Sequence, residues 1–249
     1  DMRALRITLC TEGPIELPLA YNELVQGLLY SCWHEHFPKL HDVGYGDLRS
    51  FRPLTFSRLT GRCKTDGKRR LVRFDDTLAF ELRSPFEELI EQAAIELSRR
   101  ESVRLGPHKL KVTNLEAADR LLFPQRAIIR LVTPVVAYVT LKDGHTQFYS
   151  PEEDEWVRHI QKNARWKMGV LGLEGATELQ LTPLADTLRK QVTRFKRTMV
   201  TGWMGKVALA CDPNMMATLY YLGMGSKNAQ GFGMFDILDR PLQTMDALP

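Results

Sequence analysis

A regular alternation of strand-like and helix-like segments constrains the fold of this chain more than any other feature. Apolar residues repeat with period two in some stretches and with period 3.6 in others. In the first half the order is strand, helix, two strands, helix and strand, near residues 3–10, 22–37, 51–59, 71–82, 84–100 and 102–115. In the second half a similar order recurs, near residues 126–141, 150–164, 177–183, 191–201, 203–210, 213–222 and 232–238.

Prolines, glycines and short polar residues mark the expected ends of the helices. We expect Asn22, Ser84 and Asp212 to open helices, because short polar side chains can accept hydrogen bonds from the first free N–H groups. Pro38 and Gly223 are expected to end the first and last of them. Two βαββαβ series predict an α+β fold with tandem ferredoxin-like (RRM-like) domains. We place these domains at residues 1–120 and 121–249.

Length and cysteine usage exclude several classes of protein. The 249 residues contain no stretch that approaches the ~18 apolar residues of a membrane-spanning helix. The apolar run in Arg3–Cys10 is short and broken by charge, so we expect no signal peptide and no membrane partner. The four cysteines are widely spaced, at Cys10, Cys32, Cys63 and Cys211. This spacing supports neither a disulfide scaffold nor a zinc knuckle, and it predicts a cytoplasmic location.

The net charge of +4 conceals two strongly basic blocks. Residues 58–73 hold seven bases and one acid, and residues 189–206 hold six bases and no acid. Each block has a net charge of +6, and since the whole chain has +4, the remaining residues have a net charge of −8. Such blocks are typical of a polyanion-binding surface, since neutralised phosphates release counterions. The alternative interpretation is that each block is an ordinary solvated face or loop.

A glycine-rich loop, Gly223–Gly233, follows the last helix. Four glycines in eleven residues permit positive φ angles and close backbone approach. Ser226, Lys227 and Asn228 supply hydrogen-bond donors that suit a phosphate-bearing ligand. The loop is neither a P-loop nor a dinucleotide fingerprint, because it leads into a strand instead of a helix.

The sequence GMGSKNAQGFGMFDIL in this loop resembles the signature loop of the CRISPR-associated repeat-cleaving endoribonucleases of the RAMP superfamily. Four other segments resemble that family in the same order along the chain: LPLAYNELVQGLLYSCW, LHDVGYGDLRSFRPLTFSRL, LVTPVVAYV and FKRTMVTGWMGKVALACDPNM. The resemblance implies cleavage of precursor CRISPR RNA within each repeat, without metal or cofactor, leaving 2′,3′-cyclic phosphate and 5′-OH ends. The tandem ferredoxin-like fold of that family agrees with the order of elements.

Such cleavage needs a base for the 2′-OH proton, an acid for the departing 5′-oxygen and a cation near the phosphoryl oxygens. By resemblance, His41 in LHDVG stands where family members place a catalytic histidine, and Tyr30 in QGLLY matches a helix tyrosine. Arg52 stands roughly where some members carry a catalytic lysine, with Arg49 as an alternative. An arginine there acts only through its charge, because its guanidinium does not lose its proton.

His34 and His36 are further catalytic candidates, because some family members use a pair of histidines. Tyr30 and His34 are i, i+4 neighbours whose side chains can meet on one helix face. The alternative is that both histidines are polar residues of a last helical turn. No other ligands stand at metal-binding spacing around them. The remaining histidines lie in segments without a matching motif and are predicted to be surface residues: His108, His145 and His159.

The expected partner is CRISPR repeat RNA or its processed product, bound by the glycine loop and by the second basic block. The expected RNA-binding residues are Gly223, Gly225, Ser226, Lys227, Asn228, Gly231, Gly233, Arg189, Lys190, Arg194, Lys196 and Arg197. A non-cleaving RAMP-type subunit that binds guide RNA is an alternative, and an enzyme for a phosphorylated metabolite is another. The sequence leaves open whether the chain is a monomer or a homodimer, and whether it joins other CRISPR effector subunits.

Overall fold

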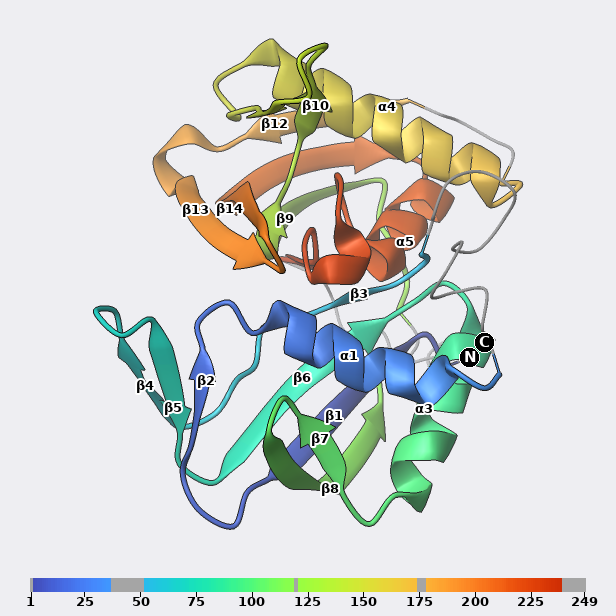
Figure 1. Cartoon of the computed structure of the whole chain (residues 1–249). Helices are drawn as coiled ribbons and strands as arrows, with labels where there is room; N and C mark the ends of the chain where they lie inside the picture. The colour runs from blue at the N-terminus through green and yellow to red at the C-terminus, as the bar shows by residue number, and fades with distance from the viewer. Residues whose placement is uncertain (1, 37–51, 119–120, 174–177, 239–249) are drawn as a thin grey trace, which may run out of the picture. The chain divides into compact units, whose positions relative to one another are not determined.

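A computed structural model of the chain describes residues 2–36, 52–118, 121–173 and 178–238 (Figure 1). The chain divides into two compact units. The first unit comprises Asp1–Ala118 with two short later segments, Thr193–Thr198 and Ala229–Gly231, and the second comprises the remainder. None of the helices in the described ranges combines the length and the apolar character that a membrane crossing needs.

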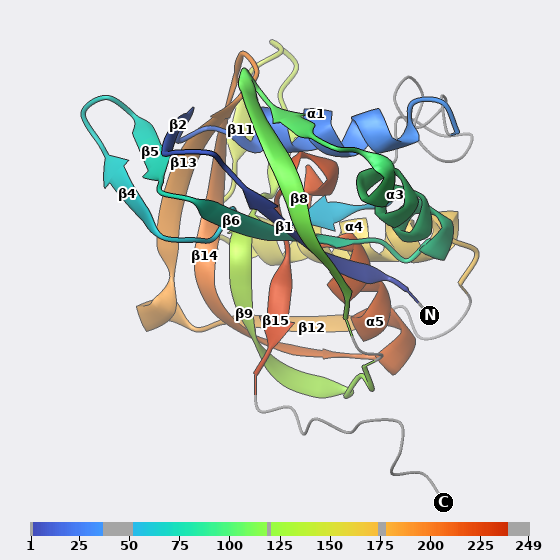
Figure 2. The same ribbon diagram turned by 90° about the horizontal axis from the view of Figure 1, so that it is seen from below.

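The first unit is built on a five-stranded antiparallel sheet. Its strands lie in the order β3 (Thr55–Phe56), β6 (Thr77–Arg83), β1 (Ala4–Cys10), β8 (His108–Ala117) and β7 (Val103–Leu105). Figure 2 shows β1 between β6 and β8, where Ile7 pairs with Phe80 on one side and with Leu115 on the other. Helices α1 (Asn22–Trp33) and α3 (Glu87–Arg99) pack against each other and complete the core. The Trp33 indole donates a hydrogen bond to Leu89 O at 2.8 Å and joins the two helices.

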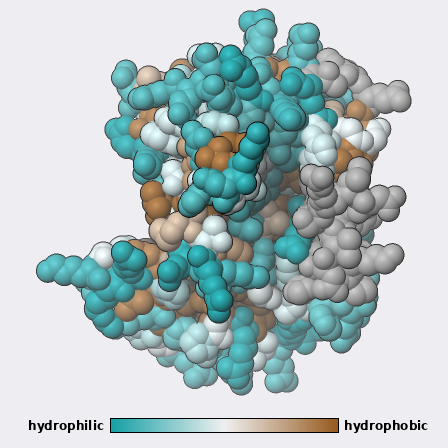
Figure 3. All heavy atoms as spheres, turned by 45° about the horizontal axis from the view of Figure 1, so that its top comes forward, coloured by the Kyte–Doolittle hydropathy of each residue, from teal (hydrophilic) through white to brown (hydrophobic). Residues whose placement is uncertain are grey.

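A smaller sheet of three strands extends from the first unit. It consists of β2 (Ile15–Pro18), β5 (Leu71–Phe74) and β4 (Cys63–Asp66). The hairpin β4–β5 contains most of the first basic block and forms the hydrophilic projection at the left of Figures 1 and 3. The predicted strand 71–82 is therefore two strands, interrupted at Asp75 and Asp76. The Asp76 carbonyl accepts a hydrogen bond from Thr11 N, which stabilises this break.

The second unit contains a second antiparallel sheet with two helices. Its strands lie in the order β12 (Leu179–Pro183), β14 (Thr198–Cys211), β9 (Arg126–Val135) and β15 (Phe235–Ile237), and β13 (Arg189–Phe195) pairs with β14. The helices are α4 (Asp154–Val170) and α5 (Pro213–Leu222), and α4 lies along β12 in Figure 1. A separate hairpin, β10 (Tyr138–Thr140) and β11 (Thr146–Phe148), precedes α4.

The two sheets share one topology. We number the four strands of each βαββαβ series along the chain. Within each sheet, neighbouring strands then follow the order second, third, first and fourth: β3-β6-β1-β8 in the first unit and β12-β14-β9-β15 in the second. This is the strand order of the ferredoxin-like fold, and the predicted α+β class with two such units is confirmed.

Three local predictions need correction. Tyr21 and Phe86 occupy the N-cap positions of α1 and α3, not Asn22 and Ser84. The Ser84 hydroxyl instead accepts a hydrogen bond from Phe86 N and donates one to Pro53 O. The second basic segment turns at Lys196 and not near Gly202, because Lys196 adopts a positive φ of 54°. At the last helix the prediction is confirmed, since the Asp212 carboxylate accepts from Asn214 N and Gly223 follows the final turn.

Candidate active site and RNA-binding surfaces

Helix α1 carries two of the candidate catalytic residues on one side. Its apolar residues, including Leu29 and Trp33, face the core of the first unit. His34 follows the helix, and its N–H donates to Tyr30 O at 3.0 Å, so the helical conformation continues through this residue. Tyr30 and His34 therefore lie one turn apart. Both line a pocket of about 510 Å³, which we call the pocket along α1.

The same pocket holds His36 and several charged groups. His36 Nε2 lies 3.8 Å from Glu96 Oε1 on α3. Arg100, at the end of α3, donates to Ser31 Oγ at 2.8 Å and to Ser31 O at 2.9 Å. Lys196, one of the expected RNA-binding residues, also lines the pocket. Groups that can transfer a proton thus lie beside groups that can attract a phosphate.

Arg52 lies over the aromatic ring of Tyr30. Its guanidinium carbon is 5.5 Å from the ring centroid, which is a cation–π distance. Burial raises the pKa of the Tyr30 hydroxyl above its ordinary value of 10.0, although the charge of Arg52 opposes this shift. Tyr30 is consequently a hydrogen-bond donor at neutral pH and not a base. His41 and Arg49 lie outside the described residues.

The glycine loop has a backbone that only glycine accommodates at several positions. Gly223, Gly225, Gly231 and Gly233 all have positive φ angles, between 71° and 96°. A Cβ atom at Gly223 would lie 2.5 Å from Asn228 Nδ2, and one at Gly225 would lie 2.6 Å from Val136 O. The glycines therefore serve the compact shape of the loop, and the number of glycines, which exceeds the need of a simple turn, has a structural cause.

Asn228 stabilises the loop from within. Its side chain is buried, and Nδ2 donates to Met224 O and to Phe232 O, each at 3.1 Å. Both amide hydrogens are thus used inside the loop. Ser226 and Lys227 are half-buried and carry the polar groups of the loop that lie nearer to solvent.

Lys167 on α4 also supports the loop and was not among the residues predicted from the sequence. The side chain is 2% exposed, and Nζ donates to Gly223 O at 3.0 Å and to Gly225 O at 2.8 Å. Burial lowers the pKa of this ammonium to about 7. One feature of the sequence indicates that Lys167 is buried: its spacing places it on the same side of α4 as Trp156, Ile160 and Ala164.

His159 also contacts the loop, so the prediction that it is a surface residue is wrong. It is half-buried, and its Nε2 lies 2.9 Å from Ser226 Oγ. Burial lowers the pKa of this imidazole, and the nearby charges of Lys167 and Lys162 lower it further. A neutral imidazole can share one hydrogen with the serine hydroxyl.

Residues 229–231 of the loop belong to the first unit, where they contact α1. Gln26 Nε2 donates to Ala229 O at 2.8 Å, and Asn22 Nδ2 donates to Gln230 O at 2.9 Å. Both side chains are buried, which is unusual for carboxamides unless their hydrogen bonds are made. These bonds explain why polar residues stand on the inner side of the helix.

The β13–β14 hairpin exposes the expected basic residues, namely Arg189, Lys190, Arg194, Lys196 and Arg197. Among the described residues, none of them has a carboxylate within 4.0 Å. Phe195 at the tip is buried and lies beside Lys196, whose Nζ is 6.0 Å from its ring centroid. The hairpin therefore presents unneutralised positive charge to solvent.

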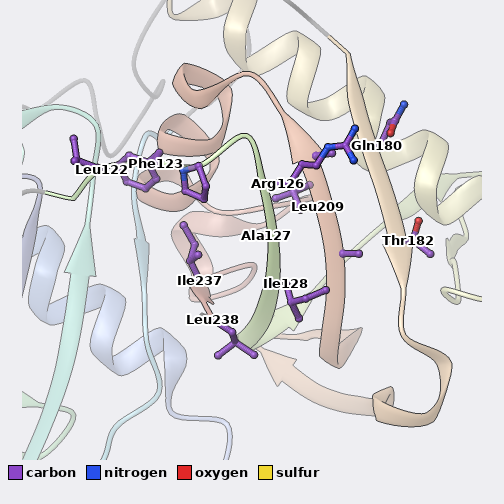
Figure 4. A pocket seen from close by; sticks show the side chains of 13 residues that line it. Leu122, Phe123, Arg126, Ala127, Ile128, Gln180, Thr182, Leu209, Ile237 and Leu238 are labelled. Atoms are coloured by element: carbon purple, nitrogen blue, oxygen red, sulfur yellow. The ribbon is translucent and has the colours of Figure 1, made fainter. Parts of the chain in front are cut away.

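A larger pocket of about 660 Å³ lies on the sheet of the second unit and contains none of the predicted site residues (Figure 4). It is lined mainly by apolar side chains, among them Phe123, Ile128 and Leu209, with Arg126 and Gln180 at its side. This surface lacks a group that could transfer a proton at neutral pH. We therefore place the candidate active site in the pocket along α1.

Comparisons with known proteins agree with this fold. The family model for the CRISPR associated protein Cas6, C-terminal, matches residues 117–237, whereas a comparison with curated proteins finds no match. The product of a Cas6-related gene from Pyrococcus furiosus is 16% identical, with a TM-score of 0.83 over 97% of this chain and 100% of that chain. A structure described as a RAMP protein binding different RNA substrates is 18% identical, with a TM-score of 0.82 over 95% and 100%.

A Cas6 product complex from Thermus thermophilus is 17% identical, with a TM-score of 0.69 over 96% of this chain and 100% of that chain. At these identities the structural likeness establishes the fold. The sequence match covers the second unit from β9 to β15 and includes the whole glycine loop. This match, which includes the loop, makes the second unit similar to the Cas6-type family of CRISPR-associated proteins, and the predicted resemblance is confirmed.

Proposed function

We propose that this chain is an endoribonuclease that binds CRISPR repeat RNA and cuts it by attack of a 2′-OH on the adjacent phosphorus. The products are a 2′,3′-cyclic phosphate and a 5′-OH end. One observation carries the proposal: the pocket along α1 brings Tyr30, His34 and His36 together with the cations Arg100 and Lys196. The names of two similar structures, one a product complex and one a protein that binds RNA substrates, support the same activity.

Each candidate has a distinct role in this reaction. His41 transfers a proton, either from the 2′-OH or to the departing 5′-oxygen, since imidazole titrates near neutral pH. The protonated hydroxyl of Tyr30 donates a hydrogen bond to the reacting phosphate. Arg52 contributes positive charge where negative charge develops on the phosphoryl oxygens. His34 and His36 are the alternative residues for proton transfer.

RNA binding is assigned to the glycine loop and to the β13–β14 hairpin. The exposed cations of the hairpin contact backbone phosphates, which positions the RNA without reading its bases. In the glycine loop, Ser226 and Lys227 are the donors we assign to the RNA, while Asn228 stabilises the loop itself. Base-specific contacts require unpaired or looped nucleotides, as in most sequence-specific RNA recognition.

The test is incubation of the full chain with its cognate repeat RNA in the presence of EDTA. We expect cleavage at one position, with a 2′,3′-cyclic phosphate on the upstream product. Cleavage that needs added Mg²⁺ would contradict metal independence alone. RNA that binds but stays intact under both conditions would contradict the nuclease and favour a non-cleaving guide-RNA-binding subunit. Failure to bind any RNA at low salt would contradict both.

A further inference from the structure

A third pocket, of about 590 Å³, lies in the second unit apart from every residue assigned to cleavage. The β10–β11 hairpin and helix α4 form its sides, through Val139, Thr140 and Arg158 among others, and Ser226 of the glycine loop contributes to its lining. This volume lies within the range of small-molecule sites and is ample for one nucleotide. We call it the α4 pocket.

Three aromatic side chains line the α4 pocket: Tyr138, Tyr149 and Trp166. Tyr138 is held by its neighbours, since its ring centroid lies 5.8 Å from that of Phe148 and 6.2 Å from that of His159. Trp166 is 41% exposed, although indole is among the largest apolar groups that a protein can bury. An aromatic ring exposed beside a cavity is a surface on which a base can stack.

Positive charge surrounds these rings. Arg158 and Lys162 line the pocket, and Nζ of Lys227 lies 5.0 Å from the ring centroid of Tyr138. Arg158 shares its charge with Asp154 at 3.8 Å and with Glu155 at 3.7 Å, and Glu155 also lines the pocket. Lys162 has no carboxylate within 4.0 Å in the part of the chain that the structure describes. Its ammonium is thus available to an anionic ligand.

The pocket also offers neutral polar groups. His159 and Ser226 share a hydrogen bond at 2.9 Å on its lining. Asn163 also lines it, and the Oδ1 atom of that side chain is buried with no hydrogen-bond partner in the described ranges. A buried amide oxygen without a donor is unfavourable, and the amino group of a base is a suitable donor.

We propose that the α4 pocket binds an unpaired nucleotide of the RNA, with the base stacked on Trp166 and the phosphate near Lys162. The proposal rests on the proposed function only in taking RNA as the ligand. A nucleotide can stack on Trp166, pair its phosphate with Lys162 and donate a hydrogen bond to Asn163 Oδ1. An apolar ligand would leave these polar groups unpaired. The contact with Ser226 joins this site to the glycine loop.

The first experiment is a fluorescence titration with short unpaired oligoadenylate and oligouridylate. Stacking on Trp166 should quench the tryptophan emission of the wild-type chain, and Trp166→Leu should abolish the quenching and weaken binding about tenfold. A mononucleotide serves as a parallel ligand, and equal affinity for it would assign the site to a free nucleotide and contradict an RNA strand. Quenching that persists in Trp166→Leu would also overturn the proposal.

A matched pair of variants on α4 tests the cation. Lys162→Gln should weaken oligonucleotide binding several-fold, because it removes one phosphate contact. Arg165→Gln removes the same charge from an exposed residue of the same helix that does not line the pocket, and it should leave binding unchanged. Equal effects of the two variants would contradict the site.

Cleavage of the cognate repeat RNA, measured on the same variants, separates this proposal from the proposed function. If the wild-type chain cuts the repeat and Trp166→Leu binds oligonucleotides normally, the α4 pocket is refuted and the nuclease stands. If unpaired RNA binds through Trp166 while the repeat stays intact, the pocket stands and the nuclease is refuted. A protein ligand in this pocket would leave every RNA measurement unchanged in the variants, which also refutes the proposal.

Discussion

Helices α1 and α4 occupy the same position in the two ferredoxin-like units, yet they bind the glycine loop by different chemistry. Within the first unit, the neutral carboxamides of Asn22 and Gln26 donate to the carbonyls of Gln230 and Ala229. Within the second unit, the ammonium of Lys167 donates to the carbonyls of Gly223 and Gly225. Both helices thus use buried polar groups where a core helix would ordinarily place apolar ones.

This difference shows how helices at the same position of one topology can hold the loop in a pH-independent or in a pH-dependent way. Carboxamides do not titrate, so the contacts of α1 are independent of pH, and the outer side of that helix carries the candidate catalytic residues. Lysine does titrate, and burial brings the pKa of Lys167 close to neutrality. The first unit therefore combines the loop contact with the proposed chemistry, whereas the second holds the loop through a titratable group.

The largest expected effect concerns the first unit. We predict that His41→Ala lowers the rate of repeat cleavage by about 10²–10⁴-fold and leaves RNA affinity unchanged, because general acid–base catalysis contributes that much. Single-turnover cleavage and equilibrium binding measure the two quantities. His34→Ala and His36→Ala are the comparison variants. Normal cleavage by His41→Ala together with a loss in either of these would move proton transfer to the pocket along α1.

The next effect concerns the second unit. Lys167→Met keeps much of the side-chain volume but leaves two buried carbonyls without a donor, which should lower the free energy of unfolding by about 3 kcal/mol. Urea denaturation measures it. Arg165→Met, an exposed change on the same helix, should stay within about 0.5 kcal/mol of the wild type. Equal stability of the two variants would remove Lys167 from its supporting role.

The two basic hairpins allow a charge-matched comparison. Arg194→Glu with Arg197→Glu should weaken repeat RNA binding at least about tenfold and reduce the slope of affinity against salt by about two. The control places the same reversal at Lys64 on β4 and at Arg62 directly before it, to which we assign no RNA contact. An unaltered salt slope in the first variant, or an equal change in the second, would contradict the assignment of RNA binding to β13–β14.

The buried lysine also predicts a dependence of stability on pH. The pKa of Lys167 falls from 10.5 to about 7 on folding, so between these values the unfolded chain carries the additional proton. The stability of the wild type relative to Lys167→Met should therefore rise with pH in this window, by at most about 1.4 kcal/mol per pH unit. Below pH 7 both states are protonated and the difference is constant. A flat difference throughout would contradict a neutralised lysine.

The smallest effect belongs to the carboxamides of α1. Gln26→Met removes the donor to Ala229 O and should cost about 1 kcal/mol of unfolding free energy at every pH. Thermal unfolding at several pH values tests both the magnitude and the absence of a pH trend. Glu23→Gln, an exposed change on the same helix, is the control. A pH trend in Gln26→Met as large as that of Lys167→Met would abolish the contrast between the two helices.

Local sequence signals predicted most of the fold. Apolar periodicity reports the order of elements, and Asp212 and Gly223 mark the ends of α5 because capping depends on neighbours along the chain. The spacing of Tyr30 and His34 likewise predicted a shared surface, which the pocket along α1 confirms. The break at Asp75 was missed because the strand-like residues on both sides of it form one continuous apolar pattern.

Long-range contacts of the glycine loop could not be predicted in the same way. Gln26 bonds to a carbonyl 203 residues later in the chain, and His159 bonds to a serine 67 residues later. Nothing next to these residues indicates such partners. Lys167 is the exception, because it stands as a charged residue among the apolar residues on one side of α4. Burying an unpaired charge is costly, so a lysine at such a position indicates a buried hydrogen-bond partner.

The segment Ala229–Gly231 has a consequence for the synthesis of the protein. A ribosome completes the strands and helices of Asp1–Ala118 long before it reaches these residues, which follow Ala118 by more than a hundred positions. Until then, the amide hydrogens of Asn22 and Gln26 lack the carbonyls that they bond in the finished molecule. Two side-chain hydrogen bonds of the first helix therefore form only after the last tenth of the chain has been synthesised.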